Sequence, residues 1–471
     1  MQSIDKIYIN GQFVTPLGEE LFALFNPATE EVIGQVRLAN ADDAQRAIAA
    51  AKEAFPRHAR TTKAERMDML RRMQAAVAAR EDELFEAIVT EYGAPVSRAR
   101  WMAAYAHDVI GHVADALAAY PFDIDAGRAR VSMQPLGVAG LITPWNSDAG
   151  FICHKLATAL AAGCTAVIKP SEMSAIQTAI VTQALHEAQL PAGLINIVTG
   201  RGDVVGAAIS ASPDVAKISF TGSTATGKTI LRSAAETFKR VTLELGGKSP
   251  TIILDDADVA KVTPLVVAVG FMNSGQACIA GTRILVPRSR LAEFETALVD
   301  EVRRIKSGDP RDADTAIGPM VSAKQWQRVQ GYIRLGIEEG AILLAGGEGR
   351  PEGMTRGWCV KPTLFTGVRN DMRIAREEIF GPVISIIAYN DDADAVRIAN
   401  DTDYGLHALV LGEDQTRAER VAAQLEAGRI LVNTLEHEHR APFGGFKHSG
   451  IGREMGPWGL AAFMETKALV V

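Results

Sequence analysis

The hydrophobic pattern of the first third of the chain predicts short strands followed by helices. Ile7–Ile9 and Leu21–Phe25 are compact apolar runs, and the turn residues Asn10 and Gly11 follow the first of them, which is typical of β-strands. Further along, apolar residues return at helical spacing, and a weakly alternating stretch then indicates an extended hairpin. Helices are predicted at residues 41–55, 63–92 and 96–120, and the hairpin at 121–133.

From Gly137 onward, short apolar runs alternate with amphipathic helical segments. This alternation is typical of βαβ units and predicts a buried parallel sheet. The strands are predicted at 137–142, 165–168, 194–198 and 216–220, with helices at 152–162, 175–188 and 204–210. A second α/β block is predicted after Pro250, with strands at 251–254, 283–286, 383–387 and 429–433 and helices at 259–273, 291–305, 393–399 and 416–425.

Polar or glycine-rich turns follow the four strands of the first block. They begin at Thr143, Lys169, Gly200 and Thr221. Because the carboxyl ends of parallel strands meet at one edge of a sheet, these turns are expected to form a common ligand-binding edge. No G-x-G-x-x-G turn is present, and Gly200-Arg-Gly202 is only a partial analogue.

Composition narrows the class of protein. The chain has 471 residues, 47% hydrophobic and 22% charged, which is ordinary for a globular protein of two or three domains. A net charge of -7 argues against a nucleic-acid partner. The first residues lack the apolar core of a signal peptide, and no apolar run is long enough to span a membrane. The four cysteines show neither metal-ligand spacing nor a disulfide framework, so a cytoplasmic protein with reduced thiols and no metal is expected.

The most informative stretch runs from Glu244 to Cys278. It opens with Glu244-Leu-Gly-Gly-Lys-Ser-Pro250 and closes with Asn273-Ser-Gly-Gln-Ala-Cys278. A carboxylate and a thiol at its two ends are the groups needed for covalent catalysis with a water-activating base. Cys153, Cys164 and Cys359 lack such surroundings and are expected to be buried hydrophobic residues.

A second motif suggests a different enzyme. Gly222-Ser-Thr-Ala-Thr-Gly-Lys-Thr229 matches the phosphate-loop pattern, and Thr251-Ile-Ile-Leu-Asp255 is similar to the strand that carries a magnesium-binding Asp. A P-loop nucleotide triphosphatase is therefore the alternative interpretation. Against it, the motif follows the fourth predicted parallel strand rather than the first, and leaves Cys278 and Asn146 without a role.

Over essentially its whole length, the sequence resembles the aldehyde dehydrogenase superfamily. The motifs that carry the resemblance occur in family order: Pro144-Trp-Asn146, Lys169-Pro-Ser-Glu172, Phe220-Thr-Gly-Ser223, Glu244-Leu-Gly-Gly-Lys-Ser249, Gly275-Gln-Ala-Cys278, Glu378-Ile-Phe-Gly-Pro382 and Pro442-Phe-Gly-Gly445 followed by Ser449-Gly450 and Gly452-Arg-Glu454.

The resemblance implies a catalytic mechanism. Cys278 attacks the aldehyde, and Asn146 with the Cys278 backbone N–H stabilises the resulting oxyanion. Hydride passes to the nicotinamide, and Glu244 activates the water that hydrolyses the thioester. The presence of Glu244 favours hydrolysis to an acid over transfer to coenzyme A. Lys155 and Glu454 are implied as a proton relay, although an ordinary structural ion pair is an equal alternative.

The resemblance also implies where the cofactor binds. Glu172 and Lys169 would hold the adenosine ribose, and a carboxylate there favours NAD over NADP, with NADP still open. Trp145 and Ser223 would contact the pyrophosphate, while Glu378 and Phe380 would position the nicotinamide. Further cofactor-binding positions implied are Ile142, Thr143, Pro144, Ser171, Gly202, Gly222 and Leu245.

Two departures from the family pattern concern the substrate. Ser147 and Asp148 stand where the family often has Phe-Pro, and Glu436-His437-Glu-His-Arg440 replaces a more apolar loop. We expect a roomy, polar entrance and a polar or bulky aldehyde, with Arg440 a candidate partner for a semialdehyde carboxylate. A solvated rim without a role in binding is the alternative.

The resemblance implies an α/β fold in three parts. Residues 1–116 and 136–246 would form a Rossmann-type NAD-binding domain, 247–446 the catalytic domain, and 117–135 with 447–471 a β arm for oligomerisation. A homodimer or homotetramer is expected. A catalytically silent NAD-binding protein is a further alternative, which the intact Cys278, Glu244 and Asn146 argue against.

Overall fold

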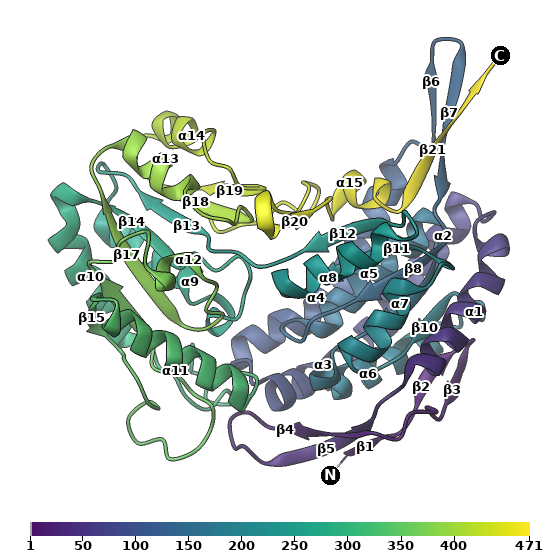
Figure 1. The fold of residues 1–471 in the computed structure, drawn as a ribbon, viewed down its shortest axis with the longest axis horizontal. Helices are drawn as coiled ribbons and strands as arrows, with labels where there is room; N and C mark the ends of the chain where they lie inside the picture. The colour runs from purple at the N-terminus through teal and green to yellow at the C-terminus, as the bar shows by residue number, and fades with distance from the viewer. Residues whose placement is uncertain (1) are drawn as a thin grey trace.

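The computed structural model describes residues 2–471 and places most strands in two large sheets (Figure 1). The first has eight strands in the order β20-β12-β11-β8-β9-β10-β2-β3. Their bounds are β20 Gly450–Ile451, β12 Arg240–Glu244, β11 Val215–Thr221, β8 Val138–Ile142, β9 Thr165–Lys169, β10 Ile195–Ile197, β2 Ile7–Ile9 and β3 Gln12–Val14. The five central strands β12, β11, β8, β9 and β10 run parallel, which confirms the predicted parallel sheet.

The second sheet has seven strands in the order β15-β16-β17-β14-β13-β18-β19. They are β15 Ile342–Ala345, β16 Thr363–Thr366, β17 Val383–Tyr389, β14 Arg283–Pro287, β13 Pro250–Ile253, β18 His407–Leu411 and β19 Arg429–Val432. All neighbours pair in parallel except β15 with β16. The strands β15, β16 and β18 were not among those predicted, although β18 is buried at every position.

The helices cover both sheets. They are α1 Ala41–His58, α2 Lys63–Ala78, α3 Glu81–Ala87, α4 Val96–Ala119, α5 Asp148–Ala162, α6 Ala175–Glu187, α7 Ala207–Ala211, α8 Thr224–Ala235, α9 Val259–Gly270, α10 Leu291–Arg304, α11 Ala323–Glu338, α12 Arg373–Arg376, α13 Asp392–Asn400, α14 Gln415–Ala422 and α15 Gly456–Ala461, with short turns at Ile88–Tyr92, Glu172–Ser174, Gly202–Gly206, Met272–Gly275, Arg288–Arg290 and Lys447–Ser449. No helix among residues 2–471 has the length and apolar character needed to cross a bilayer.

Two helix predictions were wrong in extent. The helix predicted over 63–92 is broken at Ala79 and Arg80 and ends in a π-helical turn over Ile88–Tyr92. The helix predicted over 259–273 ends at Gly270, because Asn273 and Ser274 adopt left-handed backbone angles that no α-helix accommodates.

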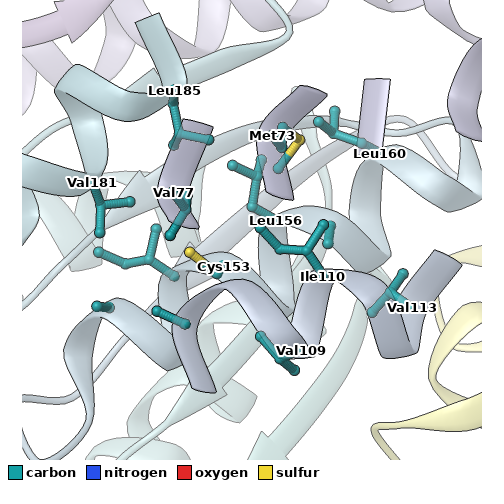
Figure 2. Packing of buried hydrophobic residues seen from close by; sticks show 14 of the residues in the cluster. Met73, Val77, Val109, Ile110, Val113, Cys153, Leu156, Leu160, Val181 and Leu185 are labelled. Atoms are coloured by element: carbon teal, nitrogen blue, oxygen red, sulfur yellow. The ribbon is translucent and has the colours of Figure 1, made fainter. Parts of the chain in front are cut away.

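The largest hydrophobic cluster lies between α2, α4, α5 and α6 (Figure 2). Met73 and Val77 from α2 meet Ile110 from α4 and Leu156 from α5. Cys153 is fully buried within this cluster, and Cys164 and Cys359 are equally inaccessible, as predicted for structural cysteines. Because α5 is buried on nearly every side, its polar residues are held in fixed positions beneath the first sheet.

Two smaller sheets complete the fold. The strands β1 Gln2–Ile4, β5 Val32–Arg37 and β4 Leu21–Phe25 form one. The strands β6 Asp123–Ala126, β7 Ala129–Pro135 and β21 Met464–Val470 form an antiparallel arm that projects from the body of the molecule (Figure 1). Strand β20 is not part of this arm, since it pairs with β12 at the edge of the first sheet.

Candidate active site

Cys278 follows a strained turn that positions it between the two sheets. Three consecutive residues, Asn273, Ser274 and Gly275, have φ values of 53°, 59° and 72°. A Cβ on Gly275 would lie 2.2 Å from the carbonyl carbon of Gly381, so only glycine fits there without displacing the backbone. Left-handed backbone at non-glycine residues is uncommon and persists where the surroundings impose it.

The Cys278 thiol is partly buried and free of disulfide bonds. Burial and the charges of Glu378 and Glu244 raise its pKa to about 12, although the backbone N–H groups of Cys278 and Ile279 point at the sulfur and oppose this shift. The resting sulfur is therefore a thiol at neutral pH and must lose its proton as it reacts.

Asn146 is held beside the cysteine loop by reciprocal hydrogen bonds. Its side-chain Nδ2 donates to the Gln276 carbonyl at 2.9 Å, and Asn273 Nδ2 donates to the Asn146 carbonyl at 3.1 Å. One N–H of the Asn146 amide remains available, since an NH₂ group has two donors. The structure thus holds Asn146 against the loop that precedes Cys278.

Glu244 lies at the end of β12 with both carboxylate oxygens buried and without a hydrogen-bond partner among residues 2–471. Burial and the nearby charge of Glu454 raise its pKa well above the ordinary value, and Lys155, Arg453 and Arg429 offset only part of that shift. A buried acceptor without a partner is rare and calls for an explanation.

Two glycines let the base and the nucleophile approach each other. A Cβ on Gly247 would lie 2.4 Å from the Cys278 carbonyl oxygen, and one on Gly444 would lie 2.8 Å from Glu244 Oε1. The two ends of the stretch from Glu244 to Cys278 are therefore folded onto each other. Any side chain larger than the hydrogen of glycine at position 247 or 444 would fill the space that lets these two parts approach each other.

Lys155, Ser219 and Glu454 form a buried cluster beneath Glu244. Lys155 Nζ donates to Ser219 Oγ at 2.9 Å and also contacts Glu454 Oε1, while Ser219 Oγ donates to Glu454 Oε1 at 3.0 Å. The charges of Lys155 and then His154 hold the Glu454 pKa below its ordinary value despite burial. No hydrogen bond joins this cluster to Glu244 within residues 2–471, so a relay between them requires a bridging water.

A second group of predicted residues includes Glu378, whose charge acts on the Cys278 thiol. Glu378 Oε1 accepts from the Gly247 N–H at 3.0 Å, and burial raises the Glu378 pKa to about 7. Phe380 has a left-handed φ of 61° and packs edge-on against Trp145, with 5.4 Å between ring centroids. Since Phe380 follows α12 and Trp145 follows β8, this contact joins the two α/β blocks beside the thiol.

The remaining predicted cofactor residues line the carboxyl edge of the first sheet. Lys169 ends β9, and its Nζ donates to Glu172 Oε2 at 3.1 Å. Ser171 caps the turn at Glu172–Ser174 through its Oγ. Ile142, Thr143 and Pro144 continue β8, Gly202 opens the π-helical turn after β10, and Leu245 follows β12.

The segment Gly222–Thr229 does not have the form of a phosphate loop. Helix α8 already begins at Thr224, so most of the motif is helix rather than a loop of N–H groups wrapped around phosphates. Ser223 caps this helix, its Oγ accepting from the Thr226 N–H at 3.2 Å, and Lys228 is exposed on the helix surface. What remains is an exposed helix N-terminus that attracts a single anionic group.

The predicted substrate residues differ in their exposure to solvent. Ser147 is partly accessible beside Asn146, and Glu436 and His437 are exposed. Asp148 is fully buried and accepts hydrogen bonds from Thr143 at 3.3 Å and Thr178 at 2.8 Å, so its assignment to the entrance was wrong.

Arg440 also differs from the prediction. It pairs with Glu438 and is not free for a substrate carboxylate.

Comparison with known proteins agrees with this geometry. The sequence model of the aldehyde dehydrogenase family matches residues 13–469. The chain belongs to the aldehyde dehydrogenase family. It therefore follows that the alternatives of a P-loop triphosphatase and of a silent binding protein are not supported.

Solved aldehyde dehydrogenases superpose on nearly the whole chain. A variant of aldehyde dehydrogenase C from Pseudomonas syringae, in complex with NAD+ and octanal, is 45% identical with a TM-score of 0.97, covering 99% of this chain and 96% of that one. The Mycobacterium tuberculosis aldehyde dehydrogenase complexed with NAD+ is 38% identical with a TM-score of 0.96, covering 100% and 98%. A betaine aldehyde dehydrogenase from Staphylococcus aureus is 35% identical with a TM-score of 0.95, covering 99% and 94%.

Sequence reasoning missed several residues of this aldehyde dehydrogenase site. Asn273 and Gln276 fix Asn146, and Ser219 completes the buried cluster with Lys155. Asn273-Ser-Gly275 carried a usable signal, because Asn and Gly are the residues that most readily adopt left-handed angles. Ser219 carried none, since a serine inside a buried strand has no distinctive spacing.

Proposed function

We propose that this enzyme oxidises an aldehyde to its carboxylic acid with Cys278 as nucleophile. The observation that carries the proposal is the convergence of a thiol, a free amide N–H and an orphaned carboxyl group at one point between the sheets. Cys278 Sγ forms a bond to the aldehyde carbon, and the oxyanion is stabilised by Asn146 Nδ2 and the Cys278 backbone N–H.

Glu244 then takes a proton from the hydrolytic water. Its carboxyl group has no competing partner, so a water molecule can occupy the space that Gly444 leaves open. Attack of that water on the thioester releases the acid and returns the proton to Cys278. The proton that the Cys278 thiol gives up as it attacks the aldehyde leaves in the first half of the reaction, and we propose that it reaches solvent through bridging water and the cluster of Lys155, Ser219 and Glu454.

The residues present fit a dinucleotide cofactor. Gly202 has no atoms within 4 Å of the position of a Cβ, the N-terminus of α8 is exposed, and Glu378 lies beside Cys278. Lys169 with Glu172 would hold the ribose, the α8 N-terminus the pyrophosphate, and Glu378 with Phe380 the nicotinamide half. NAD, when bound, supplies the acceptor for the hydride that converts the cysteine adduct to a thioester.

NAD is preferred over NADP in this proposal. Lys169 is already engaged with Glu172, so its charge is partly neutralised and does not attract a 2′-phosphate. The NAD+ complexes of the Pseudomonas syringae and Mycobacterium tuberculosis relatives support the same assignment. The ratio of kcat/KM with NAD to that with NADP measures this preference.

The deciding experiment follows NADH formation with a panel of aldehydes. Octanal belongs in the panel because the Pseudomonas syringae relative was crystallised with it. Turnover that is lost in Cys278→Ala supports the proposal. Turnover retained in that variant, or no turnover with any aldehyde, contradicts it.

We further propose a cytoplasmic location and a homo-oligomer. All four cysteines are free, and a reducing compartment keeps Cys278 as a thiol. Strands β6 and β21 are the edges of the projecting arm, and Leu469 and Val470 expose 60% and 68% of their surface. Edge strands with exposed apolar residues are suited to pairing with another chain.

A further inference from the structure

Three histidines from different elements surround a small cavity near Glu454. His112 comes from α4, His154 from α5 and His439 from the loop after β19. All three line a cavity of about 20 Å³, which also borders Met455, the residue that follows Glu454. A cavity of this size with polar groups in its wall has room for a water molecule. We call His112, His154 and His439 the histidine group.

His154 connects this cavity to the buried cluster of Lys155, Ser219 and Glu454. The Nδ1 atom of His154 lies 3.8 Å from Glu454 Oε2, whereas Lys155 and Ser219 contact the other carboxylate oxygen, Oε1. Glu454 therefore faces the cluster with one oxygen and His154 with the other. The distance of 3.8 Å is slightly longer than a hydrogen bond, and contacts of this kind commonly tighten when a substrate binds.

The surroundings of His154 favour a ring that accepts a proton. Burial lowers the pKa of His154 and favours its neutral form, the charges of Lys155 and His112 act in the same direction, and the charge of Glu454 opposes them. A neutral imidazole has one nitrogen that accepts and one that donates, so it can take up a proton at one side and release another at the opposite side. Since Nδ1 faces Glu454, Nε2 is the nitrogen left for water in the cavity.

The other two histidines extend from the cavity to the surface. The rings of His112 and His439 stack with 3.8 Å between their centroids and 12° between their planes. The His439 side chain is 38% exposed, and its Nδ1 lies 3.7 Å from Glu438 Oε1. Burial and the charge of His439 lower the pKa of His112, while the charges of Asp108, Asp115 and Glu438 oppose this shift. A proton that reaches the stacked rings is therefore in contact with solvent and with acidic side chains.

The strand side of the cluster is closed. Lys217 lies two residues before Ser219 on β11 and is 1% exposed. Its Nζ donates to Thr242 Oγ1 and lies 5.3 Å from the centre of the Phe463 ring. The charged group next to Ser219 on this strand is thus enclosed, whereas His154 borders a cavity that leads outward.

Resting on the proposed function, we infer that the histidine group carries the thiol proton from Glu454 to solvent. Glu454 Oε2 gives the proton to His154 Nδ1, His154 Nε2 releases its own proton to water in the cavity, and His112 or His439 passes it to the surface. Exchange of the remaining ring proton with water restores the starting tautomer of His154. The one proton that solvent gains balances the one that Cys278 loses, and no other bond changes.

The test measures NADH formation in a single turnover, with enzyme in excess over aldehyde and NAD saturating. This rate depends on the loss of the thiol proton, because the thiolate must form before hydride can leave the adduct. Wild type, His154→Gln and the double variant His112→Gln/His439→Gln are compared in dilute buffer, with and without added imidazole. His107→Gln is the matched control, since His107 also lies on α4 but pairs with Glu81 and does not line the cavity.

His154→Gln should slow single-turnover NADH formation by about 10-fold or more, and imidazole should restore part of the rate by carrying the proton in its place. The steady-state KM for the aldehyde should stay near that of wild type. The double variant should show the same loss and the same rescue, although it leaves His154 in place. His107→Gln should match wild type with and without imidazole.

A wild-type rate in both His154→Gln and the double variant overturns the inference and leaves the proposed function standing. A loss that imidazole does not restore in either variant, or one confined to the KM for the aldehyde, also overturns it, because side chains that only shape the pocket give that result. Absence of NADH formation by wild type with every aldehyde contradicts the proposed function itself, and the inference with it.

Discussion

At the scale of single residues, burial raises the pKa values of both reacting groups. The charges of Glu378 and Glu244 raise the pKa of the Cys278 thiol further, and the charge of Glu454 raises that of the Glu244 carboxyl group further. In the proposed mechanism the two groups act in separate halves of the reaction: Cys278 loses its proton as the adduct forms, and Glu244 takes a proton from water as the thioester is hydrolysed.

Replacing Glu244 with Gln should separate these two halves. The amide cannot accept the proton of water, so the thioester should accumulate. We expect a burst of about one NADH per subunit, followed by a steady-state rate lowered about 10²- to 10⁴-fold. Rapid-mixing measurements check this, and a variant without a burst and without turnover would indicate instead that Glu244 acts before thioester formation.

The raised pKa of Glu244 also predicts how stability depends on pH. Its folded pKa lies above the ordinary value of 4.5, so the folded state binds one more proton between that value and the folded pKa. The stabilisation is present below pH 4.5 and is lost as pH rises through the folded pKa. Compared with wild type, Glu244→Gln should gain stability as pH rises from 4.5 through the folded pKa of Glu244. Parallel Tm curves for the two proteins over that range would contradict the assignment.

At the scale of elements, the turn before Cys278 carries the strain of the site. Asn273, Ser274 and Gly275 reverse the chain after α9 so that Gln276 reaches Asn146 and its side chain accepts from the Val321 N–H. The same turn explains why the helix ends at Gly270. Local hydrophobic periodicity continues past that point, but contacts with distant residues decide the backbone angles.

Gly275→Ala should disrupt this turn. The new Cβ would overlap the Gly381 carbonyl, and the left-handed φ would be strained, so we expect a loss of about 1–3 kcal/mol in the free energy of unfolding and a lower kcat. Gly331→Ala is the control, because it lies exposed inside α11 with open space around its Cβ position. That substitution should stabilise by about 0.5–1 kcal/mol. Denaturant unfolding with activity assays measures both, and equal behaviour of the two variants would contradict the role of the turn.

Elements whose local hydrophobic pattern matches their burial in the fold could be predicted from the sequence. Strands β8, β9 and β11 and helices α1 and α6 have local patterns that agree with their burial in the sheet and its covering layer. The break at Ala79 and Arg80 has no glycine or proline to announce it. Cys278, Glu244 and Asn146 could be expected together through family motifs, whereas Ser219 joins Lys155 and Glu454 only through tertiary packing.

At the scale of the whole molecule, the projecting arm exposes apolar residues that nothing in the single chain covers among residues 2–471. Strand β6 is exposed along its whole length, and Leu469 and Val470 near the end of β21 have no apolar cover. Apolar surface on an edge strand is stabilised when a second chain covers it.

Leu469→Asp should therefore weaken self-association. A charge on the arm would be desolvated in an interface, so the variant should dissociate at concentrations where wild type remains oligomeric. Ile337→Asp is the control, since Ile337 is 48% exposed on α11, away from the arm. Light scattering reports the masses. A wild-type particle of 50.4 kDa would contradict the proposed oligomer.

The placement of Glu454, β20 and β21 has a consequence for synthesis. Strand β20 closes the edge of the first sheet beside Glu244, Glu454 completes the cluster with Lys155, and β21 completes the arm. All three lie after Cys278 in the sequence and are therefore synthesised after it. A nascent chain that already contains Cys278, Asn146 and Glu244 still lacks the parts that surround Glu244. The surroundings of Glu244 are thus completed only after translation has passed this segment, well after Cys278 itself has been made.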